Sequence, residues 1–482
     1  MEKFTFIDLF AGIGGFRLAL NNLGGKCINF SEVNKDAINT YCENYNEDAS
    51  YNLGDITKIK ELPYHDLLTG GVPCQSWSIA GKNLGFEDDR GQLWNDTIFL
   101  LNKSKPKAFI FENVKGLVDP RNKEAFDYIL SQIRKAGYFV NYYLLSSSDY
   151  GVPQSRVRVF LIGFKEKQFS DKFTLPPIVE KQYLINYLDN KDKFIEEINL
   201  SVSQEERKFI LSSNSGFNDY FLFNDLRNGD TTIHSWDLID TTLKQKEICL
   251  LLLKNRRKKL YGSLDGNPLS LKHFQELDKS IQHKDLEDLV ELKILKKKAY
   301  KFEINSYTNL NKESEKFLSL IDSKTFIIDE IKNNKILRKE KIKINEMIEL
   351  LLSNNNISCI ESRYDFKNTK ISTGIFGINR VFLPNSYIFP TLVASDSNDY
   401  VSTIIIKADN IFDYKKEFIE KIYKGKNFRK ITKEEACRIQ GFPSNFKLPS
   451  HRAKWMRLIG NSVSVPVIEL LGKSIIKTGV FD

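Results

Sequence analysis

The feature that most constrains the fold is an apolar segment followed by a glycine-rich turn near the start of the chain. Thr5–Phe10 is a short apolar run typical of a buried strand, and the turn Ala11–Gly15 (AGIGG) follows it directly. Glycines there permit a tight turn and let a ligand approach the backbone where the next helix begins. The sequence therefore predicts an α/β fold with a small-molecule site at the end of its first strand.

Acidic residues at defined positions strengthen this prediction. Glu32 follows a second apolar segment, Cys27–Phe30, and lies 20 positions after Gly12. Dinucleotide-type folds hold a ribose hydroxyl with an acid at that separation. Asp55 and Ile56 follow a further short segment, where an acid could hold an adenine amino group. Each residue alone could be a turn glycine, a surface carboxylate or a helix cap, but their order favours an adenosine-containing cofactor.

Further segments repeat the alternation of strands and helices. Ala108–Phe111 and Val157–Ile162 are typical of strands, and Glu124–Ala136 has the spacing of an amphipathic helix. Because strands alternate with helices, the first 165 residues predict a parallel sheet. Helices are expected again at Ile431–Gly441 and Pro466–Ile476.

One cysteine has the setting of a candidate nucleophile. Cys74 directly follows Pro73 and lies close to two glycines, which indicates a defined and accessible turn. The thiolate is the reactive form of cysteine. The other cysteines have apolar or helical surroundings typical of buried residues; they are Cys27, Cys42, Cys249, Cys359 and Cys437.

A carboxylate and two arginines are further candidates for a site. Glu112 directly follows the predicted strand Ala108–Phe111, at an edge where open α/β sheets bind ligands. It could donate a proton if its pKa were raised, or it could be an ordinary solvated residue. Alternation places Gln154, Arg156 and Arg158 on one face of a strand. That face could recognise phosphate or carbonyl oxygens, or it could be an exposed basic edge.

The composition changes between about 170 and 370, where glycine becomes rare and lysine clusters appear at 254–259, 296–298 and 338–341. Each cluster could be a solvated helical face or a nucleic-acid contact. Lys and Arg number 71 against 62 Asp and Glu, a net charge of +9 that is compatible with nucleic acid without requiring it. Because glycine and proline return after about residue 371, the middle stretch is predicted to be an insertion.

Composition also excludes several classes of protein. Hydrophobic residues make up 41% of the chain and charged residues 28%, which excludes a wholly disordered chain. No apolar run approaches the roughly 18 residues of a membrane span. The start of the chain lacks the layout of a signal peptide, and six scattered cysteines without a CxxC pair predict a reduced, cytoplasmic protein. Only five histidines are present, so no metal site is expected.

Together with Arg429–Thr432 and Gly460–Pro466, these motifs resemble, in their order and spacing, the cytosine-C5 DNA methyltransferases of bacterial restriction-modification systems. The resemblance covers residues 1 to about 165 and about 371 to 482. It implies a Rossmann-like class I methyltransferase fold with a large inserted target-recognition domain, mostly helical with some strands. The expected division is a catalytic domain of 1–165 and 426–482, and a target-recognition region of 170–425.

The resemblance implies S-adenosylmethionine (SAM) as cofactor, S-adenosylhomocysteine as product and no metal. Glu32 would hold the ribose hydroxyls, Val33 would pack on the adenine, and Asp55 with Ile56 would hold the adenine edge. The full set of residues expected to bind SAM is Phe10, Gly12, Gly14, Gly15, Glu32, Val33, Asp55, Ile56, Leu93, Asn461 and Val463.

The resemblance also implies a covalent mechanism. C5 of cytosine is too weak a nucleophile to take a methyl group directly, so the Cys74 thiolate would attack C6 and activate it. Glu112 would bind N3 and the amino group, and Arg158 the O2 carbonyl. Arg156 would support the loop, and Asn113 is expected to orient the turn that carries Cys74. The base cannot be reached inside a duplex and would be flipped out.

Double-stranded DNA is the expected partner. Its expected contacts are Ser78, Arg90, Gln154, Thr391 and Leu392. The glycine-containing segment 78–93 is predicted to close over the flipped base, and the Thr-Leu pair resembles a family element close to that base. Residues 244–305 resemble a winged-helix pattern, the alternative being an ordinary helical insert with solvated lysines.

Two other functions stay open. The first is methylation of cytosine in transfer RNA, which the large basic insert disfavours. The second is a catalytically silent DNA-binding relative, which the presence of Cys74, Glu112 and Arg158 disfavours. We expect a cytoplasmic monomer without membrane contact, acting beside a cognate restriction endonuclease without touching it.

Overall fold

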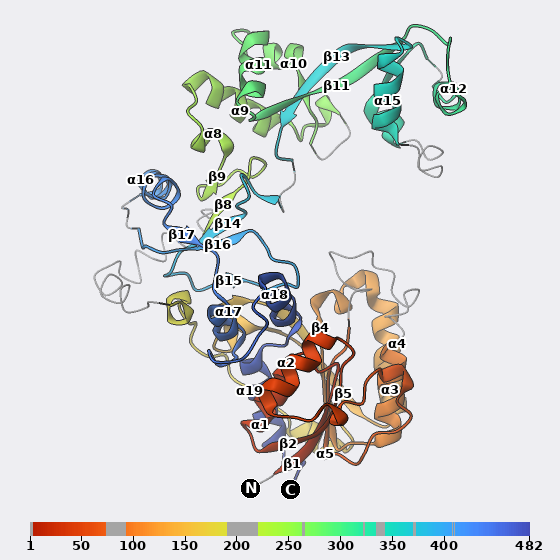
Figure 1. Ribbon diagram of the computed structural model, residues 1–482, viewed down its shortest axis with the longest axis vertical. Helices are drawn as coiled ribbons and strands as arrows, with labels where there is room; N and C mark the ends of the chain where they lie inside the picture. Colours follow the sequence, from red (N-terminus) through yellow and green to blue (C-terminus); the bar gives the residue numbers. More distant parts are fainter. Residues whose placement is uncertain are drawn as a thin grey trace. The chain divides into compact units, whose positions relative to one another are not determined.

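The chain forms two compact units in the computed structural model (Figure 1). The structure describes residues 3–73, 93–189, 220–262, 266–321, 323–333, 343–369, 373–406, 408 and 410–482. Unit 1 comprises Met1–Ser212, Asn218–Tyr220 and Val381–Asp482, and unit 2 comprises Ser213–Phe217 and Phe221–Arg380. Both ends of the chain therefore belong to unit 1, where the rings of Phe4 and Phe481 stack with centroids 4.5 Å apart.

A six-stranded sheet forms the centre of unit 1, in the order β2-β1-β3-β4-β7-β5. Its strands are β1 (Phe4–Leu9), β2 (Gly25–Ser31), β3 (Leu67–Gly71), β4 (Ala108–Val114), β5 (Phe139–Ser146) and β7 (Val157–Phe164). The pairs among β1 to β4 are parallel, as predicted, but β7 is antiparallel to both β4 and β5. A connection as short as that between β5 and β7 favours antiparallel pairing, because a parallel crossover needs a dozen or more residues.

Helices cover both faces of this sheet. They are α1 (Gly15–Asn21), α2 (Lys35–Tyr45), α3 (Leu93–Ser104), α4 (Lys123–Lys135), α5 (Lys167–Lys172), α17 (Lys433–Gln440), α18 (Arg452–Asn461) and α19 (Val465–Ile476). Figure 1 shows α3 and α4 on one side of the sheet, and α1 and α19 on the other. The two buried clusters divide in the same way, since Phe6 belongs to one and its neighbour Ile7 to the other.

Shorter elements complete unit 1. The strands are β6 (Gln154–Ser155), β14 (Arg380–Phe382), β15 (Phe389–Pro390), β16 (Asp399–Ser402) and β17 (Phe428–Arg429). The helix α16 (Ile411–Glu417) continues into a π-helix at Phe418–Lys424. Single 3-10 turns lie at Ala49–Tyr51, Ile56–Lys58, Lys115–Val118, Pro120–Asn122, Ser147–Asp149 and Leu184–Tyr187. β15 pairs with β6, and β16 pairs with β17. The chain therefore returns to unit 1 at Val381, whereas the catalytic domain was expected to continue only from residue 426.

Unit 2 contains a four-stranded antiparallel sheet in the order β10-β13-β11-β12. Its strands are β10 (Leu269–Ser270), β11 (Leu295–Ile304), β12 (Thr325–Ile327) and β13 (Ile357–Phe366). The strands β8 (Tyr220–Phe223) and β9 (Thr232–Ile233) pair in parallel and belong to a five-stranded sheet in the order β17-β16-β14-β8-β9. The helices are α8 (Ser235–Leu238), α9 (Leu243–Asn255), α10 (Leu271–Leu277), α11 (His283–Glu291), α12 (Lys312–Ser319), α13 (Ile328–Asn333) and α15 (Ile344–Ser353), with a 3-10 turn at Lys259–Tyr261.

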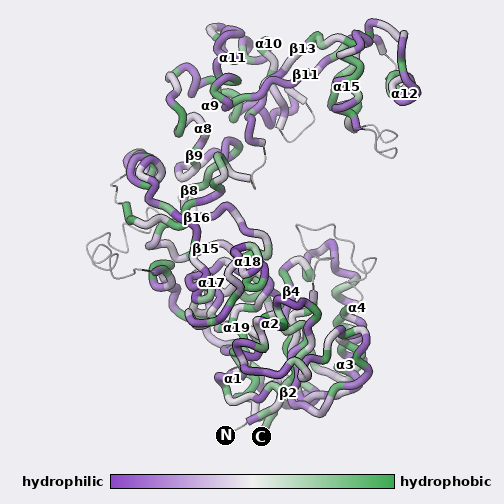
Figure 2. Tube along the Cα trace, in the orientation of Figure 1, coloured by the Kyte–Doolittle hydropathy of each residue, from purple (hydrophilic) through white to green (hydrophobic). Residues whose placement is uncertain are grey.

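The two long strands of unit 2, β11 and β13, contribute residues to two separate hydrophobic cores. At one end Leu295 and Phe366 pack with residues of α9, α10 and α11, whereas at the other end Phe302 and Ile357 pack with residues of α12 and α15. The tube of α15 is largely apolar in Figure 2, in keeping with the buried residues Met347, Ile348 and Leu351. Unit 2 is thus an elongated sheet with one helical group at each end.

One stretch of the described chain, Arg452–Ile476, is long and apolar enough to cross a membrane by length and composition. It consists of α18 and α19, and 67% of its most apolar window is buried within the protein. The core helices of globular domains pass the same test, so this stretch is weak evidence for a span.

Candidate active site

The turn after β1 has the backbone geometry that the glycine pattern predicts. Phe10, Gly12 and Gly14 adopt left-handed φ values of 52°, 56° and 84°. Glycine takes such values without strain, whereas Phe10 does so at a cost that the surrounding structure must offset. A Cβ atom at Gly12 would meet no atom of the described residues within 4 Å, so the backbone of the turn faces space where a ligand could lie.

The Glu32 carboxylate lies directly against this turn. Its Oε2 accepts a hydrogen bond of 2.8 Å from the Gly12 amide, and its Oε1 accepts bonds of 2.9 and 2.8 Å from the amides of Val33 and Asn34. The side chain of Asn52 binds both the amide and the carbonyl of Glu32, each at 3.0 Å. One carboxylate therefore fixes the ends of β1 and β2 together. Val33 beside it is 67% exposed, as an apolar platform for a ring would be.

Asp55 and Ile56 take different roles from each other. The Asp55 carboxylate accepts hydrogen bonds of 3.0 and 2.9 Å from the amide and hydroxyl of Thr57, and these bonds hold the pKa of Asp55 below its usual value. Asp55 thus caps a 3-10 turn, which leaves its second oxygen available to a ligand. The side chain of Ile56 is 4% exposed and packs in the core, so only its backbone could reach a ligand.

The end of the chain meets the cofactor turn at Gly15. A Cβ atom there would lie 2.7 Å from Val463 Cγ2 and 2.8 Å from Ser462 Oγ, so only glycine permits this close packing. Asn461 precedes this contact and is exposed at the end of α18. Leu93, the first residue of α3, is half-buried against the other core. The structure therefore brings Gly15 and Val463 into contact.

A network of buried side chains packs against the turn at Gly14. The Tyr45 hydroxyl donates a hydrogen bond of 2.6 Å to the Gly14 carbonyl, and its ring fills the space that a Gly14 side chain would need. The Arg17 guanidinium lies 4.6 Å from the centre of that ring and 2.7 Å from the Glu47 carboxylate. Tyr45 and Asn52 were not singled out from the sequence, because a lone tyrosine or asparagine carries no pattern that distinguishes such a role.

Glu112 and Arg158 form a polar pair at the edge of the central sheet where the parallel strands β3 and β4 end. Glu112 lies in β4, is 8% exposed, and has its Oε1 3.0 Å from Arg158 Nε of the neighbouring strand β7. Arg158 pairs in register with Val114, which places it diagonally beside Glu112 on one face of the sheet. Gly71 lies opposite Glu112 on β3, and a Cβ there would come within 4.0 Å of Glu112 Oε2. Beyond Gly71 and its neighbours in the chain, no other atom of the described residues lies within 4 Å of that Cβ position, which leaves space beside the carboxylate.

Asn113 connects this polar pair with the segment that leads to Cys74. Its Nδ2 donates a hydrogen bond of 3.2 Å to the Val72 carbonyl, and its Oδ1 accepts one of 2.8 Å from the Val114 amide. Asn113 thus fixes the backbone at Val72, two residues before Cys74. Cys74, Ser78 and Arg90 themselves lie outside the described residues.

Arg156 is a structural link between distant parts of unit 1. Its guanidinium donates hydrogen bonds of 3.1 Å to the carbonyls of Leu392 and Gly460, and one of 2.6 Å to that of Ser462. Burial, together with nearby Arg158, lowers the pKa of Arg156 to about 9, so it stays charged at neutral pH. Its position supports the loops around the site and does not face a substrate.

Gln154 and Leu392 do not fit the prediction that they contact DNA. Gln154 is 0% exposed, and its side chain donates to the Ile439 carbonyl at 3.1 Å and to Gln440 Oε1 at 2.8 Å. Leu392 is 3% exposed and lies in the core. Alternation misled here because Gln154 belongs to β6, which pairs with β15 inside the unit. Thr391 follows β15 and donates a hydrogen bond of 2.5 Å to the Ser155 carbonyl.

Gln440 is a further residue that the sequence did not identify. Its side chain accepts the bond from Gln154 and donates one of 2.8 Å to the Ser462 carbonyl. It lies within the expected helix Ile431–Gly441, but nothing in one sequence shows that its amide is buried. Gln154, Arg156 and Gln440 together fix the backbone that carries Asn461 and Val463.

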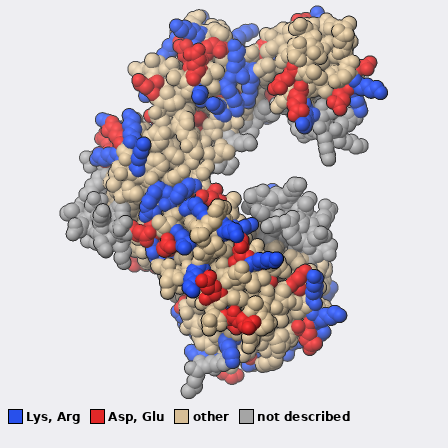
Figure 3. Space-filling model, in the orientation of Figure 1, with Lys and Arg blue, Asp and Glu red and all other residues tan. Residues whose placement is uncertain are grey.

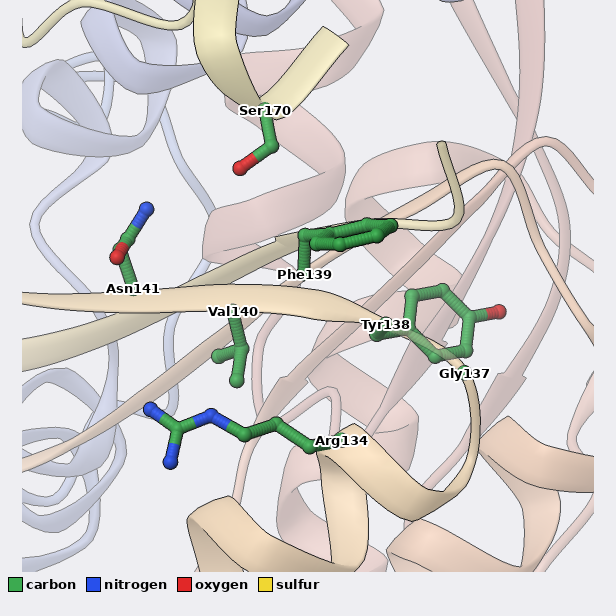
Figure 4. Close-up of a pocket in the computed structure, with 7 residues that line it drawn as sticks. All are labelled: Arg134, Gly137, Tyr138, Phe139, Val140, Asn141 and Ser170. Atoms are coloured by element: carbon green, nitrogen blue, oxygen red, sulfur yellow. The ribbon is translucent and has the colours of Figure 1, made fainter. Parts of the chain in front are cut away.

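A cavity of about 450 Å³ is found elsewhere in unit 1. It is lined by Arg134, Gly137, Tyr138, Phe139, Val140, Asn141 and Ser170, as Figure 4 shows. Phe139 and Ala108 both lie opposite Phe164, at the end of the sheet where β4 and β5 begin. The cavity is therefore at the opposite end of these strands from Glu112, and it has no part in this site. Among the described residues, no group of three or more His, Cys, Asp or Glu side chains could hold a metal ion.

The fold and the glycine turn define a SAM-dependent methyltransferase with a Rossmann-like sheet. The model of the C-5 cytosine-specific DNA methylase family matches residues 4–477, so the chain belongs to that family. It is a DNA cytosine-5-methyltransferase of the type found in restriction-modification systems, and DNA is its substrate.

Individual proteins show the same similarity. The chain is 40% identical to the Type II methyltransferase M.HgiBI of Herpetosiphon aurantiacus, covering 100% of this chain and 99% of that one. It is 30% identical to the Type II methyltransferase M.BanI of Aneurinibacillus aneurinilyticus, covering 99% and 97%. A solved methyltransferase of Entamoeba histolytica is 16% identical, covers 99% of both chains and has a TM-score of 0.48.

Proposed function

We propose that this chain methylates C5 of a cytosine flipped out of a short duplex sequence, through a covalent bond between Cys74 and C6. The observation that carries this proposal is the group formed by Glu112, Arg158 and Asn113. A carboxylate and a guanidinium lie 3.0 Å apart beside free space, and the amide next to them binds the segment that leads to Cys74. These are the groups that the covalent reaction needs at one place.

The reaction divides into steps that these residues can perform. The Cys74 thiolate attacks C6 while the Glu112 carboxyl group transfers a proton to N3. The pair of electrons displaced from the C5–C6 double bond makes C5 an enamine carbon, which takes the methyl group. Loss of the C5 proton to a base then expels the thiolate and restores the C5–C6 double bond, and N3 returns its proton to Glu112. Arg158 binds the O2 carbonyl and lies close enough to Glu112 to orient it.

SAM supplies the methyl group when it is bound, and the residues present fit such a cofactor. The open backbone at Gly12 and the exposed side chain of Val33 leave room for it beside Glu32. Phe10, Gly14, Gly15, Asp55, Leu93, Asn461 and Val463 are assigned to the same pocket, together with the backbone of Ile56. In this assignment Glu32 binds both the Gly12 turn and the ribose hydroxyls.

The remaining roles concern position and partners. Asn113 and Arg156 are positioning residues, since each binds backbone carbonyls of loops that surround the site. Ser78, Arg90 and Thr391 are assigned to DNA contacts, and unit 2 to target recognition. The protein acts in the cytoplasm as a monomer, forms S-adenosylhomocysteine without a metal, and does not touch the endonuclease of its system.

Trapping on duplex DNA that contains 5-fluorocytosine tests the mechanism. Fluorine at C5 cannot leave as a proton, so methyl transfer should leave the protein bound covalently to the DNA when SAM is present. The Cys74→Ala variant should form no such adduct, whereas Cys359→Ser, which removes an exposed cysteine of β13, should form it normally. If the unmodified chain forms no adduct on any DNA it methylates, the covalent mechanism is wrong; adducts on transfer RNA instead would identify that substrate.

A further inference from the structure

The elements of unit 2 between α9 and β13 follow the order of a winged helix. A helix, a short strand, two helices and the long strand β11 succeed one another. The second long strand, β13, follows only after an insertion that contains α12, β12, α13 and α15, and it pairs with both β11 and the short strand β10. In helix-turn-helix proteins the second helix of the turn enters the major groove. That helix is α11 here, with the sequence HKDLEDLVE.

The charge of α11 argues against this placement. The helix carries four carboxylates and one lysine. Glu287 is neutralised within the unit by Lys297 at 2.8 Å, and Asp285 by Lys244 at 2.6 Å. Asp288 and Glu291 leave the outer surface of α11 acidic, and acidic groups are repelled by phosphates. The helix that would enter the major groove is thus the least suitable surface of this unit for DNA.

A basic face lies on the neighbouring strands instead. It consists of the exposed or half-buried residues Arg257, Lys258, Lys259, Lys296, Lys298, Arg363 and Lys367, with the buried Arg256 beneath it. Asp365 of β13 lies at its centre, 2.9 Å from Arg256 and 3.1 Å from Lys298, and is 2% exposed. Lys296 donates to the Lys367 carbonyl at 3.2 Å, and like-charged Lys298 helps burial to lower its pKa. The Lys and Arg side chains of this face therefore outnumber its carboxylates, and the face carries a net positive charge.

The loop after α9 is fixed to the same face at both ends. At its start, Arg256 makes the ion pair with Asp365. At its end, Arg363 donates a hydrogen bond of 2.8 Å to the Tyr261 carbonyl, and its guanidinium lies 3.6 Å from the centre of the Tyr300 ring. Lys258 and Lys259, exposed between these two points, are therefore held beside β13. Figure 3 shows Lys and Arg gathered along β11 and β13, beside the Asp and Glu of α11.

We propose that α9, β10, α10, α11, β11 and β13 form a winged-helix unit that binds the phosphates of duplex DNA with this basic face and keeps α11 away from the major groove. The inference rests on the proposed function, because DNA is then the polyanion available to the protein. A duplex carries one negative charge per roughly 1.7 Å of its axis, so it complements a row of cations held on paired strands. Phosphate contacts fix position without reading bases, so this face supplies affinity and leaves the choice of sequence to other residues.

Neutralising two lysines of the face tests the proposal. The double variant K296Q/K298Q is compared with K272Q/K284Q, which removes two lysines from α10 and α11 of the same unit. Binding to cognate and unrelated duplexes is measured by fluorescence anisotropy over a series of salt concentrations. The face variant should lower the salt slope by about 0.9 for each phosphate that the protein no longer neutralises, and raise KM for DNA severalfold. Both duplexes should be affected equally, with kcat and the methylated sequence unchanged.

A wild-type slope and KM in K296Q/K298Q would overturn the proposal, as would a larger effect of K272Q/K284Q. A change of methylated sequence would contradict the role in affinity alone. K258Q/K259Q, which alters only exposed side chains, gives a second readout if the first variant fails to fold. Methyl transfer by the unmodified chain separates the two hypotheses, because its absence on all DNA would refute the proposed function and not merely this surface.

Lysine acetylation of the unmodified protein provides an independent measurement. A duplex should protect Lys258, Lys259, Lys298 and Lys367 from the reagent, as detected by mass spectrometry, and should leave Lys284 of α11 reactive. Protection of Lys284 without protection of the face would show that α11 enters the groove. Equal reactivity of all these lysines with and without DNA would refute the proposed interaction.

Discussion

Arg158 Nε lies 3.0 Å from Glu112 Oε1 across two antiparallel strands, so a cation faces the carboxylate that we assign as proton donor. Neither residue depends on a loop for its position, since both belong to strands of the central sheet. A site built on strands is held more precisely than one built on loops. Cys74 lies outside the described residues, and we propose that Asn113 helps to position it through the hydrogen bond to the Val72 carbonyl.

Replacing Glu112 with glutamine should remove proton donation and keep the shape of the side chain. We expect kcat in single-turnover methylation to fall by about 10² to 10⁴, the range typical of a general acid. SAM affinity should stay unchanged, because Glu112 does not contact the glycine turn. Glu124→Gln, an exposed position in the first turn of α4, is the matched control. Activity in E112Q equal to that of this control would refute the assigned role.

Replacing Glu32 with glutamine should weaken SAM binding. The carboxylate accepts three backbone hydrogen bonds through two oxygens, and glutamine offers only one oxygen. Hydrogen bonds to charged groups contribute about 1.5–3 kcal/mol each, so removing one should raise the Kd by roughly 10- to 100-fold in calorimetry. Glu43→Gln, which removes an exposed carboxylate of α2, should leave the Kd unchanged. An unaltered Kd in E32Q would show that the turn is stable without this carboxylate.

Replacing Asn113 with aspartate should affect the rate and not the cofactor. The new carboxylate would face the Val72 carbonyl, so an attractive contact of 3.2 Å would become repulsive. We expect kcat to fall by at least tenfold while the Kd for SAM stays constant, and trapping by 5-fluorocytosine to slow in parallel. Equal losses in rate and in SAM affinity would indicate general unfolding and contradict a positioning role.

Asp8 should make stability depend on pH. Burial raises the pKa of Asp8 from 3.8 to about 7, against the opposing effects of its hydrogen bond with Thr69 and the charge of Arg17. The unfolded chain therefore releases this proton at lower pH than the folded one. As the pH rises from roughly 4 to 7, the free energy of unfolding falls by about 1.4 kcal/mol for each pH unit. Asp8→Asn should be the more stable protein above pH 7, and the difference in Tm should shrink as pH falls towards 4. A difference in Tm that is constant with pH would contradict this.

Replacing Arg156 with methionine should destabilise unit 1. The substitution would leave the buried carbonyls of Leu392 and Gly460 without the Arg156 donor, at about 1–3 kcal/mol each, while the Ser462 carbonyl would keep only its bond from Gln440. We expect the free energy of unfolding in urea to fall by about 3 kcal/mol or more. Arg121→Met, at an exposed position, should cause little change. A variant as stable as this control would show that water or other groups satisfy these carbonyls.

Much of the fold followed from local patterns. The expected strands at Thr5–Phe10, Cys27–Phe30, Ala108–Phe111 and Val157–Ile162 are confirmed, because each is a run of apolar residues long enough for a buried strand. The direction of β7 was not predictable in this way. The direction depends on the length of the connection from β5. The strand β5 itself was not recognised, because its exposed positions carry the apolar residues Phe139, Tyr142 and Leu144.

Polar residues were harder to interpret than apolar ones. The separation of Gly12 and Glu32 in the chain indicated a cofactor site, and the structure shows in addition that the two residues are in contact. Gln154 could not be understood locally, because its partners Ile439 and Gln440 lie far away in the chain. A buried amide and an exposed amide look the same in a sequence without relatives, and only the fold distinguishes them.

The packing of α1 against α19 has a consequence for synthesis. The helix that follows the first strand is covered by the last helix, and Gly15 meets Val463 only after almost the whole chain has been translated. Folding cannot therefore proceed strictly from the amino end, and the central sheet of the nascent chain lacks a covering layer until its end emerges from the ribosome. A polypeptide interrupted anywhere before α19 would lack a complete cofactor turn, so unfinished chains would not modify DNA.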